Sequence, residues 1–448
     1  MSHVAPARAA AFEILLTLER GSGHSDELLH RPAIERLSPQ DRNLATNLVM
    51  GTLRWQIALD ANIKSLLARP ETRLHSIARV SLRLGAFQLL YLDRVPVYAA
   101  IGESVELAKT GGQPYAAGMV NAVLRKIAAQ SRKKVPDTVT NTTELAAICA
   151  HPEWLVERWV SNFGLQAARQ ICEYDQQPAP TFVRLLETEA EQELLAEGVE
   201  LAPARFLANV RTVTRGDVSS TAAFREGRVR IQDEGSQLVA ELAGPGLKIL
   251  DSCAAPGGKA AILAERNPSA SITACDVSKK RLSDMQRTLR NQANIDFRLA
   301  DIAKKELEPE FDLVLCDAPC SGTGTLARNP EIRHRLRPEE LKRQHERQVA
   351  ILKSVMRGVS PGERLLYSTC SLEPEENETV IHECLRGRDD FKLVRIDGEV
   401  ERLERAGILL PEGAKTLRKT ALVNGCLRTL PGVHACDGFF AALLIRHA

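Results

Sequence analysis

Short apolar segments alternate with helical segments between residues 247 and 317, and this alternation restricts the fold more than any other feature of the chain. Strands are expected at 247–250, 271–275, 297–300 and 311–316, and helices at 259–266 and 279–292. Strands that alternate with helices favour a parallel sheet covered by helices. Ligands of such open sheets bind outside the carboxyl ends of the strands. The residues that follow each strand are therefore the candidates for a functional site.

Two cysteines follow two of the expected strands. Cys320 lies in Asp-Ala-Pro-Cys-Ser-Gly-Thr-Gly at 317–324, and Cys370 lies in Ser-Thr-Cys-Ser at 368–371, after a further strand expected at 364–367. Two thiols at the ends of two strands of one sheet can face one substrate. The alternative is that both are ordinary core residues, because free cysteine is among the most buried residue types.

A loop of small residues, Asp-Ser-Cys-Ala-Ala-Pro-Gly-Gly-Lys at 251–259, follows the strand at 247–250. Paired glycines allow the backbone to approach a ligand closely. The loop contains neither the dinucleotide pattern G-x-G-x-x-G nor the P-loop pattern G-x-x-x-x-G-K-[ST]. It therefore favours a nucleoside with little phosphate, the alternative being a plain tight turn.

Three later strands each end in an aspartate: Asp276, Asp301 and Asp317. An acidic residue at the first of these strand ends, Asp276, can accept hydrogen bonds from ribose hydroxyls. One such aspartate is more often a helix cap or a turn residue. Three in succession after a glycine loop indicate a nucleoside site.

Taken together, the loop and the two cysteine motifs resemble the Sun type of RNA 5-methylcytosine methyltransferases, and among them the bacterial 16S rRNA enzymes. Asn-Ala-Val-Leu-Arg at 121–125 resembles the end of that family's NusB-like domain, and Asp-Gly-Phe-Phe at 437–440 its last strand. The resemblance covers the whole chain. It implies an enzyme that methylates carbon-5 of a cytidine in 16S rRNA with S-adenosylmethionine, through a covalent cysteine–cytosine adduct.

The resemblance also implies roles for residues. Cys370 is the expected nucleophile, and Cys320 assists release of the product and is a candidate for the base. Asp317 is expected to hydrogen-bond the amino edge of the cytosine, and Lys259 either offsets charge near the base or is a surface residue at a helix start. The residues expected around the cofactor are Cys253, Ala254, Ala255, Pro256, Gly257, Gly258 and Lys259 at its methionine end, Asp276 at its ribose, Asp301 at its adenine, and Asp317.

The chemistry of methylation at carbon-5 explains why two thiols are present, without reference to the family. Carbon-5 of cytosine is a poor nucleophile until a thiolate adds to carbon-6, and such covalent catalysis divides one difficult step into easier ones. A thiolate at neutral pH requires a lowered pKa. Two other functions were weighed: a non-catalytic RNA-binding factor, against which the intact cysteines and aspartates argue, and a dinucleotide-dependent enzyme, against which the missing G-x-G-x-x-G argues.

The chain of 448 residues is expected to contain three parts. Helical spacing at 5–19, 40–68, 74–91, 98–109 and 115–130 predicts an all-α domain over 1–134, followed by a linker over 130–143. Residues 144–230 are expected to form a linking helix and a small α+β module, and 231–448 a Rossmann-like methyltransferase domain with an antiparallel strand pair at its end. The segment 394–419 shows no clear period.

The ten cysteines have no C-x-x-C pair or tight disulfide spacing, which favours a reducing, cytoplasmic location. A zinc site at Cys316 and Cys320 is not expected, because no second ligand pair lies nearby. Glu13 and Glu19 interrupt the N-terminal apolar pattern, so no signal peptide is expected, and no apolar run is long enough to cross a membrane.

Positive charge is concentrated although the net charge is only +2. Residues 1–134 contain 18 Lys and Arg against 11 Asp and Glu, which suits contact with RNA phosphates. A second basic cluster, with a solvated loop as the alternative, comprises Arg328, Arg333, Arg335, Arg337, Lys342 and Arg343. The expected partner is 16S rRNA, naked or in an assembly intermediate, and a monomer is expected.

Overall fold

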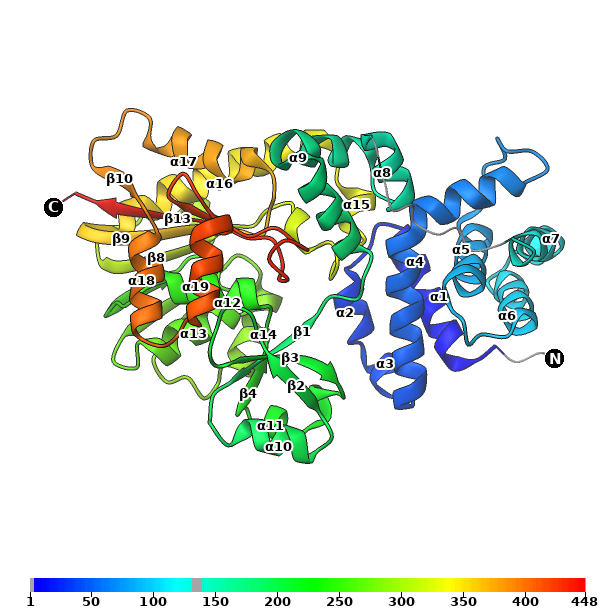
Figure 1. Ribbon diagram of the computed structural model, residues 1–448, viewed down its shortest axis with the longest axis horizontal. Coiled ribbons are helices and arrows are strands. Elements are labelled where there is room, and N and C mark those ends of the chain that lie inside the picture. The colour runs from blue at the N-terminus through cyan, green and yellow to red at the C-terminus, as the bar shows by residue number, and fades with distance from the viewer. Residues whose placement is uncertain (1–3, 131–138, 140, 448) are drawn as a thin grey trace. The chain divides into compact units, whose positions relative to one another are not determined.

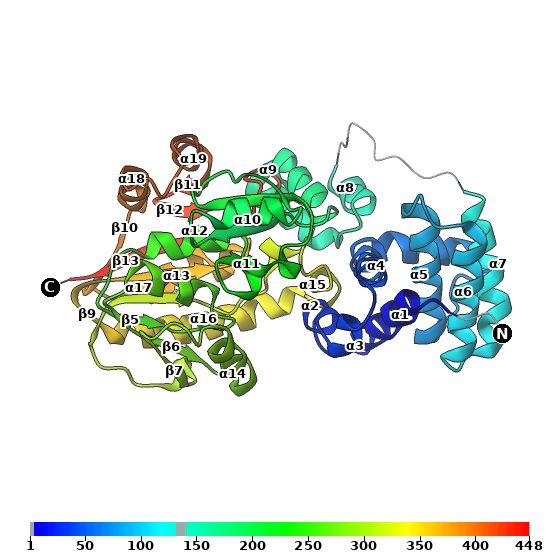
Figure 2. The same ribbon diagram turned by 90° about the horizontal axis from the view of Figure 1, so that it is seen from below.

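The computed structural model describes residues 4–130, 139 and 141–447, so most of the linker predicted at 130–143 lies outside the described residues (Figures 1 and 2). The described chain forms two compact units. Unit 1 comprises the residues up to Pro178 together with Leu326–Arg335, and unit 2 comprises Ala179–Thr325 and the residues from Leu336 onward. None of the described helices is both long and apolar enough to span a membrane.

The regular secondary structure of unit 1 is helical throughout its described part, as the sequence predicts. Helix α4 begins after Ser38, whose side chain accepts a hydrogen bond from the Asp41 amide at 3.1 Å and so caps the helix. The elements are α1 (Pro6–Glu19), α2 (Ser25–Leu29), α3 (Pro32–Glu35), α4 (Pro39–Leu66), α5 (Ser76–Tyr91), α6 (Val97–Thr110), the 3-10 turn η1 (Pro114–Ala116), α7 (Ala117–Ala128), α8 (Thr142–Ile148), α9 (Glu153–Asp175) and α15 (Ile332–Arg335).

One apolar core joins the first long helices of unit 1. Leu48 and Leu59 of α4, Leu82 and Leu84 of α5, and Leu124 of α7 are fully buried in it. Leu48 and Leu59 are eleven positions apart and lie on one side of α4, whereas Leu82 and Leu84 lie on opposite sides of α5, which is buried on most of its surface.

Unit 2 begins with a small antiparallel sheet in the order β2-β3-β1-β4. Two short helices cover it, and Val183, Ala190 and Leu194 lie in its own core. The elements are β1 (Thr181–Leu185), α10 (Ala190–Ala196), β2 (Glu200–Pro203), β3 (Val210–Arg215), the 3-10 turn η2 (Val218–Ser220), α11 (Ala222–Arg225) and β4 (Val229–Ile231). This is the predicted α+β module.

The large sheet of unit 2 has nine strands in the order β11-β12-β13-β9-β8-β5-β6-β7, with β10 paired to β13. Strands β5 to β9 are parallel to their neighbours, whereas β13 is antiparallel to β9 and to β12, as predicted for the C-terminal strand pair. The strands are β5 (Lys248–Asp251), β6 (Ser271–Asp276), β7 (Ile295–Leu299), β8 (Phe311–Asp317), β9 (Val359–Thr369), β10 (Phe391–Val394), β11 (Leu422–Val423), β12 (Cys426–Arg428) and β13 (Phe440–Arg446).

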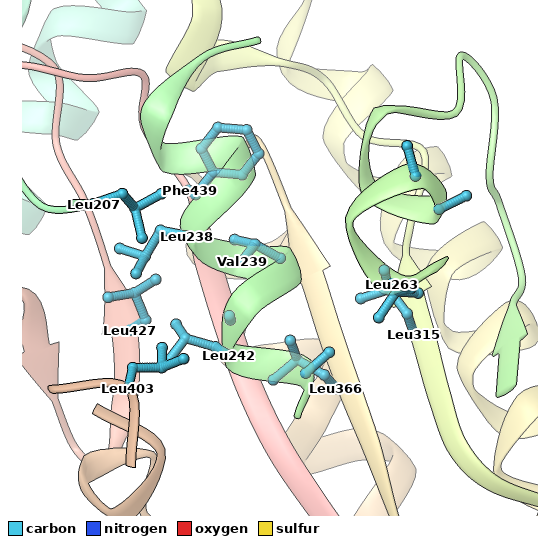
Figure 3. Packing of buried hydrophobic residues seen from close by; sticks show 14 of the residues in the cluster. Leu207, Leu238, Val239, Leu242, Leu263, Leu315, Leu366, Leu403, Leu427 and Phe439 are labelled. Carbon is cyan, nitrogen blue, oxygen red and sulfur yellow. The ribbon is translucent and has the colours of Figure 1, made fainter. Parts of the chain in front are cut away.

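Helices cover both faces of the central strands, which explains their nearly continuous apolar sequences. Ile249 packs in one core and Leu250 in the other, because successive side chains of a strand point to opposite faces. Figure 3 shows Leu238, Val239 and Leu242 of one covering helix packed in the first core. The helices are α12 (Glu234–Ala243), α13 (Gly258–Arg266), α14 (Lys279–Thr288), α16 (Pro338–Gly358) and α17 (Glu378–Leu385), with the 3-10 turns η3 (Ile302–Lys304), η4 (Thr323–Thr325) and η5 (Pro374–Glu376).

The segment without a sequence prediction, 394–419, forms α18 (Asp397–Arg405), α19 (Pro411–Thr416) and the start of a π-helical turn (Leu417–Ala421). Val400 and Leu403 are the buried apolar residues of α18. Two apolar residues in nine are too few to reveal a helical period, and the position of α18 depends on polar contacts as well. Arg402 donates to the Glu241 carbonyl, and Glu399 pairs with Arg364 at 2.8 Å.

Candidate active site

The register between β8 and β9 brings the two cysteines together. Asp317 of β8 pairs with Ser368 of β9, so both strands end at the same edge of the sheet. The Sγ atoms of Cys320 and Cys370 lie 3.4 Å apart, and both side chains are partly exposed. The alternative of two separate core cysteines is therefore wrong for the structure.

Hydrogen bonds join the loops that carry the two thiols. The Gly324 amide donates to the Cys370 carbonyl at 2.9 Å, and the Leu372 amide donates to Thr323 Oγ1 at 2.9 Å. At the base of the loops, the Ala318 amide donates to the Ser368 carbonyl at 2.8 Å. Hydrogen bonds between the two loops therefore fix the separation of the thiols.

The pKa of the Cys320 thiol lies well above its usual value. The largest causes are its hydrogen bond with the Cys370 sulfur and the desolvation of the thiol, followed by the electrostatic influence of Cys370 and Glu376. Cys320 therefore retains its proton at neutral pH.

Asp317 is held at both of its oxygens. Lys259 Nζ lies 2.7 Å from Oδ2, and Ser368 Oγ donates to Oδ1 at 2.7 Å. The Lys259 ammonium also lies 5.0 Å from the ring centroid of Phe439. Burial opposes its charge, but Asp317 and Cys370 outweigh that effect and raise the pKa of Lys259. Lys259 is therefore a buried, charged member of the site and not a surface residue.

The predicted glycine loop forms the connection from β5 to α13. Gly257 caps the amino end of α13 with a φ of 105°, a conformation that favours glycine. A β-carbon there would lie 2.7 Å from the Met285 side chain, so close packing also requires glycine. The loop is held against β6 because the Ala254 amide donates to the Cys275 carbonyl at 2.7 Å.

Asp251, which ends β5, is an acidic site residue that the sequence analysis did not count. Its side chain is buried, and within the described residues neither carboxylate oxygen has a hydrogen-bond partner of normal geometry. Burial and the nearby Asp317 carboxylate raise its pKa to about 7. The signal was present in the sequence, since the strand before the glycine loop ends in aspartate like the three after it.

Asp276 is brought to the same edge, whereas Asp301 is more peripheral. Asp276 is 4% exposed, accepts a hydrogen bond from the Ser278 amide at 2.7 Å, and adds to the negative field at Asp251. Asp301 follows β7, is exposed, and pairs with Lys304 at 3.2 Å. The buried carboxylates Asp251 and Asp276, one of them unpartnered, suit a ligand that carries positive charge and hydroxyl donors.

The sequence predicts that Arg333 and Arg335 belong to an RNA-binding surface. This prediction is wrong for Arg333, and the contacts of Arg335 give it little support. Arg333 is 2% exposed and donates to the carbonyls of Arg54, Ala150 and Asp175 within unit 1. Arg335 is partly buried and donates to the Gly23 and Leu18 carbonyls. A run of arginines does not reveal which of them meet backbone carbonyls that are distant in the sequence. The exposed cations of the cluster are Arg337, Lys342 and Arg343.

Three family models match the chain. The model "16S rRNA methyltransferase RsmB/F" matches residues 243–445, the NusB family model matches 5–129, and a ferredoxin-like domain model of RsmF/B-like methyltransferases matches 151–209. The last two models correspond to the all-α domain and to part of the small α+β module.

Curated relatives match nearly the full length. A probable ribosomal RNA small subunit methyltransferase B of Bacillus subtilis is 34% identical over 97% of both chains. A ribosomal RNA small subunit methyltransferase B of Yersinia enterocolitica is 32% identical over 90% of this chain and 95% of its own.

Solved structures also resemble this one. The crystal structure of PH0851 has a TM-score of 0.79 and 25% identity, and the match covers 99% of both chains. A methyltransferase homologue from Pyrococcus horikoshii has a TM-score of 0.54 and 28% identity, and the match covers 68% of this chain and 98% of that one.

Proposed function

Since the chain belongs to the RsmB/F family of 16S rRNA methyltransferases, we propose that it methylates carbon-5 of a cytidine in 16S rRNA, with S-adenosylmethionine as the methyl donor. The observation that carries this proposal is the 3.4 Å separation of Cys320 and Cys370. Two thiols this close can contact adjacent atoms of one pyrimidine ring. Methylation at a ring nitrogen or at a ribose hydroxyl needs no such pair.

In the proposed reaction, the Cys370 thiolate adds to carbon-6 and makes carbon-5 nucleophilic. S-adenosylmethionine, when bound, supplies an electrophilic methyl group. After the methyl group is on carbon-5, a base removes the proton that remains there, the double bond between carbons 5 and 6 forms again, and the Cys370 sulfur leaves as thiolate. We assign the base to Cys320. The partly exposed Cys320 thiol first gives its own proton to solvent water, and its thiolate then takes the proton from carbon-5, so that Cys320 ends protonated as it began.

Lys259 offsets the negative charge that develops on the cytosine, and Asp317 binds the amino edge of the base. The Asp317 carboxylate is oriented by Lys259 and Ser368, so it is preorganised to accept a hydrogen bond from the amino group. Donors and acceptors that are fixed before the reaction often supply a large part of the rate enhancement.

The cofactor would be held at the carboxyl ends of β5, β6 and β7. We assign the loop 253–259 to its methionine end, Asp276 to its ribose hydroxyls and Asp301 to its adenine. Asp251 fits the positive charges of the sulfonium and ammonium groups, because its carboxylate is buried and forms no hydrogen bond of normal geometry among the described residues.

Trapping of covalent RNA adducts tests the proposal. Cys370→Ala is expected to abolish methylation and to form no adduct. Cys320→Ala is expected to accumulate an adduct that needs both S-adenosylmethionine and Cys370, because the adduct forms but does not resolve. A denaturing gel with labelled 16S rRNA or a fragment of it measures both, and the double variant is the control that should trap nothing.

Two results would contradict the proposal in different ways. An adduct in Cys370→Ala together with none in Cys320→Ala would show that the roles of the thiols are exchanged. Methylation that persists in both variants without any adduct would exclude the covalent mechanism. Analysis of the product nucleosides by mass spectrometry identifies the methylated atom.

A further inference from the structure

A third group, the carboxylate of Glu376, lies behind the two cysteines. The side chain is fully buried at the end of η5. Its Oε1 accepts a hydrogen bond from the Ser321 amide at 2.8 Å, and its Oε2 accepts from the hydroxyls of Ser321 and Ser371. Ser321 follows Cys320 and Ser371 follows Cys370, so one carboxylate binds the residue after each thiol.

Further contacts fix Glu376 itself. Gln348 Nε2 donates to Glu376 Oε1 at 3.0 Å and to the Pro319 carbonyl at 3.0 Å, and the Tyr367 hydroxyl donates to the Glu376 carbonyl at 2.7 Å. In the part of the chain that the structure describes, Glu376 forms no ion pair. Its charge is balanced by hydrogen bonds alone, and three of these come from the serines beside the thiols.

We propose that Glu376 is a positioning residue that holds Cys320 and Cys370 at the separation needed for one cytosine. The catalytic part of this inference rests on the proposed function. The positioning part rests only on the hydrogen bonds between the two loops and the carboxylate.

The charge and the hydrogen bonds of Glu376 predict separate effects. The raised pKa of Cys320 results first from its hydrogen bond to Cys370 and from burial, then from the negative charges of Cys370 and Glu376. Removing the charge of Glu376 lowers the pKa of Cys320. Removing a donor serine leaves the charge in place and loosens only the geometry.

Glu376→Gln is the principal variant, because it keeps the size of the side chain and replaces one acceptor oxygen with an NH₂ group. Glu383→Gln is the matched control, since Glu383 lies partly exposed on α17 and contacts His345 and Lys353 rather than either cysteine loop. Loss of a charge-assisted hydrogen bond predicts that adduct resolution slows by about 10- to 100-fold in Glu376→Gln. Glu383→Gln is expected to match the wild type.

Alkylation of the thiols by iodoacetamide, followed residue by residue by mass spectrometry across pH, gives a readout independent of RNA. In Glu376→Gln the midpoint for Cys320 is expected to move to lower pH, whereas in Glu383→Gln it should stay in place. A role in folding alone would lower the melting temperature without moving this midpoint.

Ser321→Ala is expected to slow adduct resolution several-fold with an unchanged midpoint, and it serves as the second variant if Glu376→Gln does not fold.

The outcomes separate this inference from the proposed function. If the wild type methylates carbon-5 and Glu376→Gln retains both its resolution rate and its Cys320 midpoint, Glu376 is not a positioning residue and the proposed function stands. If the midpoint moves in Glu376→Gln but the wild type forms no 5-methylcytosine and no adduct, the electrostatic effect of Glu376 on Cys320 stands and the proposed function fails.

Discussion

At the residue scale, burial gives the neighbouring carboxylates different properties. Asp317 is compensated by Lys259 and Ser368, and Asp276 by the Ser278 amide, whereas neither oxygen of Asp251 has a hydrogen bond of normal geometry among the described residues and burial raises its pKa to about 7. A carboxylate that is costly to ionise becomes easier to ionise when a cation binds beside it. The cofactor site proposed above therefore predicts that Asp251 couples cofactor affinity to pH.

The pH dependence of cofactor binding tests this coupling. A group with a pKa of about 7 is largely protonated at pH 6 and largely ionised at pH 8, so affinity for S-adenosylmethionine is expected to rise across this interval. Asp251→Asn should bind more weakly at pH 8 and show a flatter profile. Calorimetric titration at several pH values measures both, with Asp296→Asn, an exposed partner of Arg298, as the control. An unchanged slope in Asp251→Asn would contradict the assignment.

Asp276 and Asp301 predict unequal effects on the same titration. Asp276→Ala removes a buried acceptor, and losing charge-assisted hydrogen bonds costs about 1.5–3 kcal/mol, or roughly tenfold or more in affinity. Asp301→Ala should cost less, because Asp301 is exposed and paired with Lys304. Equal affinities in Asp276→Ala and in the wild type, with the variant folded, would remove Asp276 from the site.

At the scale of elements, close contacts between loops maintain the thiol pair. The Cys320 loop contacts the segment before β13, where the Gly438 amide donates to the Gly324 carbonyl at 2.8 Å. A β-carbon on Gly324 would lie 2.2 Å from the Gly438 carbonyl oxygen. Gly324 is thus bonded both to Cys370 and to the segment that precedes β13.

Gly324→Ala is therefore expected to displace the Cys320 loop. Overpacking against backbone predicts a loss of about 1–3 kcal/mol in the free energy of unfolding, together with a clear loss of methylation, because the thiols move apart. Gly398→Ala is the control, since a β-carbon at that exposed position of α18 meets no atom within 4 Å. Urea unfolding and methylation assays measure the two effects. Full activity in Gly324→Ala would show that the loop tolerates the shift.

At the scale of the whole molecule, the chain leaves unit 2 after Thr325, contributes Leu326–Arg335 to unit 1, and returns to unit 2 at Leu336. Buried polar contacts hold this segment in unit 1. Besides the bonds of Arg333, both Glu331 carboxylate oxygens accept hydrogen bonds from Ser25, and His334 Nε2 lies 2.7 Å from the Leu53 carbonyl oxygen. The segment that follows the catalytic motif is thus part of the helical unit.

The buried Arg333 and the exposed Arg337 predict opposite phenotypes. Arg333→Gln removes donors to three buried carbonyls, so unit 1 is expected to lose at least about 2 kcal/mol of stability. Its unfolding can be followed by tryptophan fluorescence, because Trp55, Trp154 and Trp159 all lie in unit 1. Arg337→Gln, at an exposed position, should leave unfolding unchanged, weaken RNA binding and reduce its salt dependence by about one phosphate contact. Weaker RNA binding by an Arg333→Gln variant of unchanged stability would support the prediction that Arg333 belongs to an RNA-binding surface.

The sequence alone determined the strand order along the chain, the aspartates at the strand ends, the glycine loop and the two cysteine motifs. These features depend on short-range patterns, because strand periodicity and turn residues act over a few positions. The fold class and the family follow from them, and the structure and the comparisons confirm both. The helices of unit 1 were predictable for the same reason.

Only the tertiary structure decided which side chains of those motifs meet. The register of β8 and β9 brings the two thiols within 3.4 Å, and it brings Ser321, Ser371 and Glu376 together behind them. The burial of Arg333 likewise depends on carbonyls that are about 160 to 280 residues away in the sequence. Burial and long-range hydrogen bonds have no local pattern, so a charged residue that looks exposed in a sequence becomes structural once the chain folds around it.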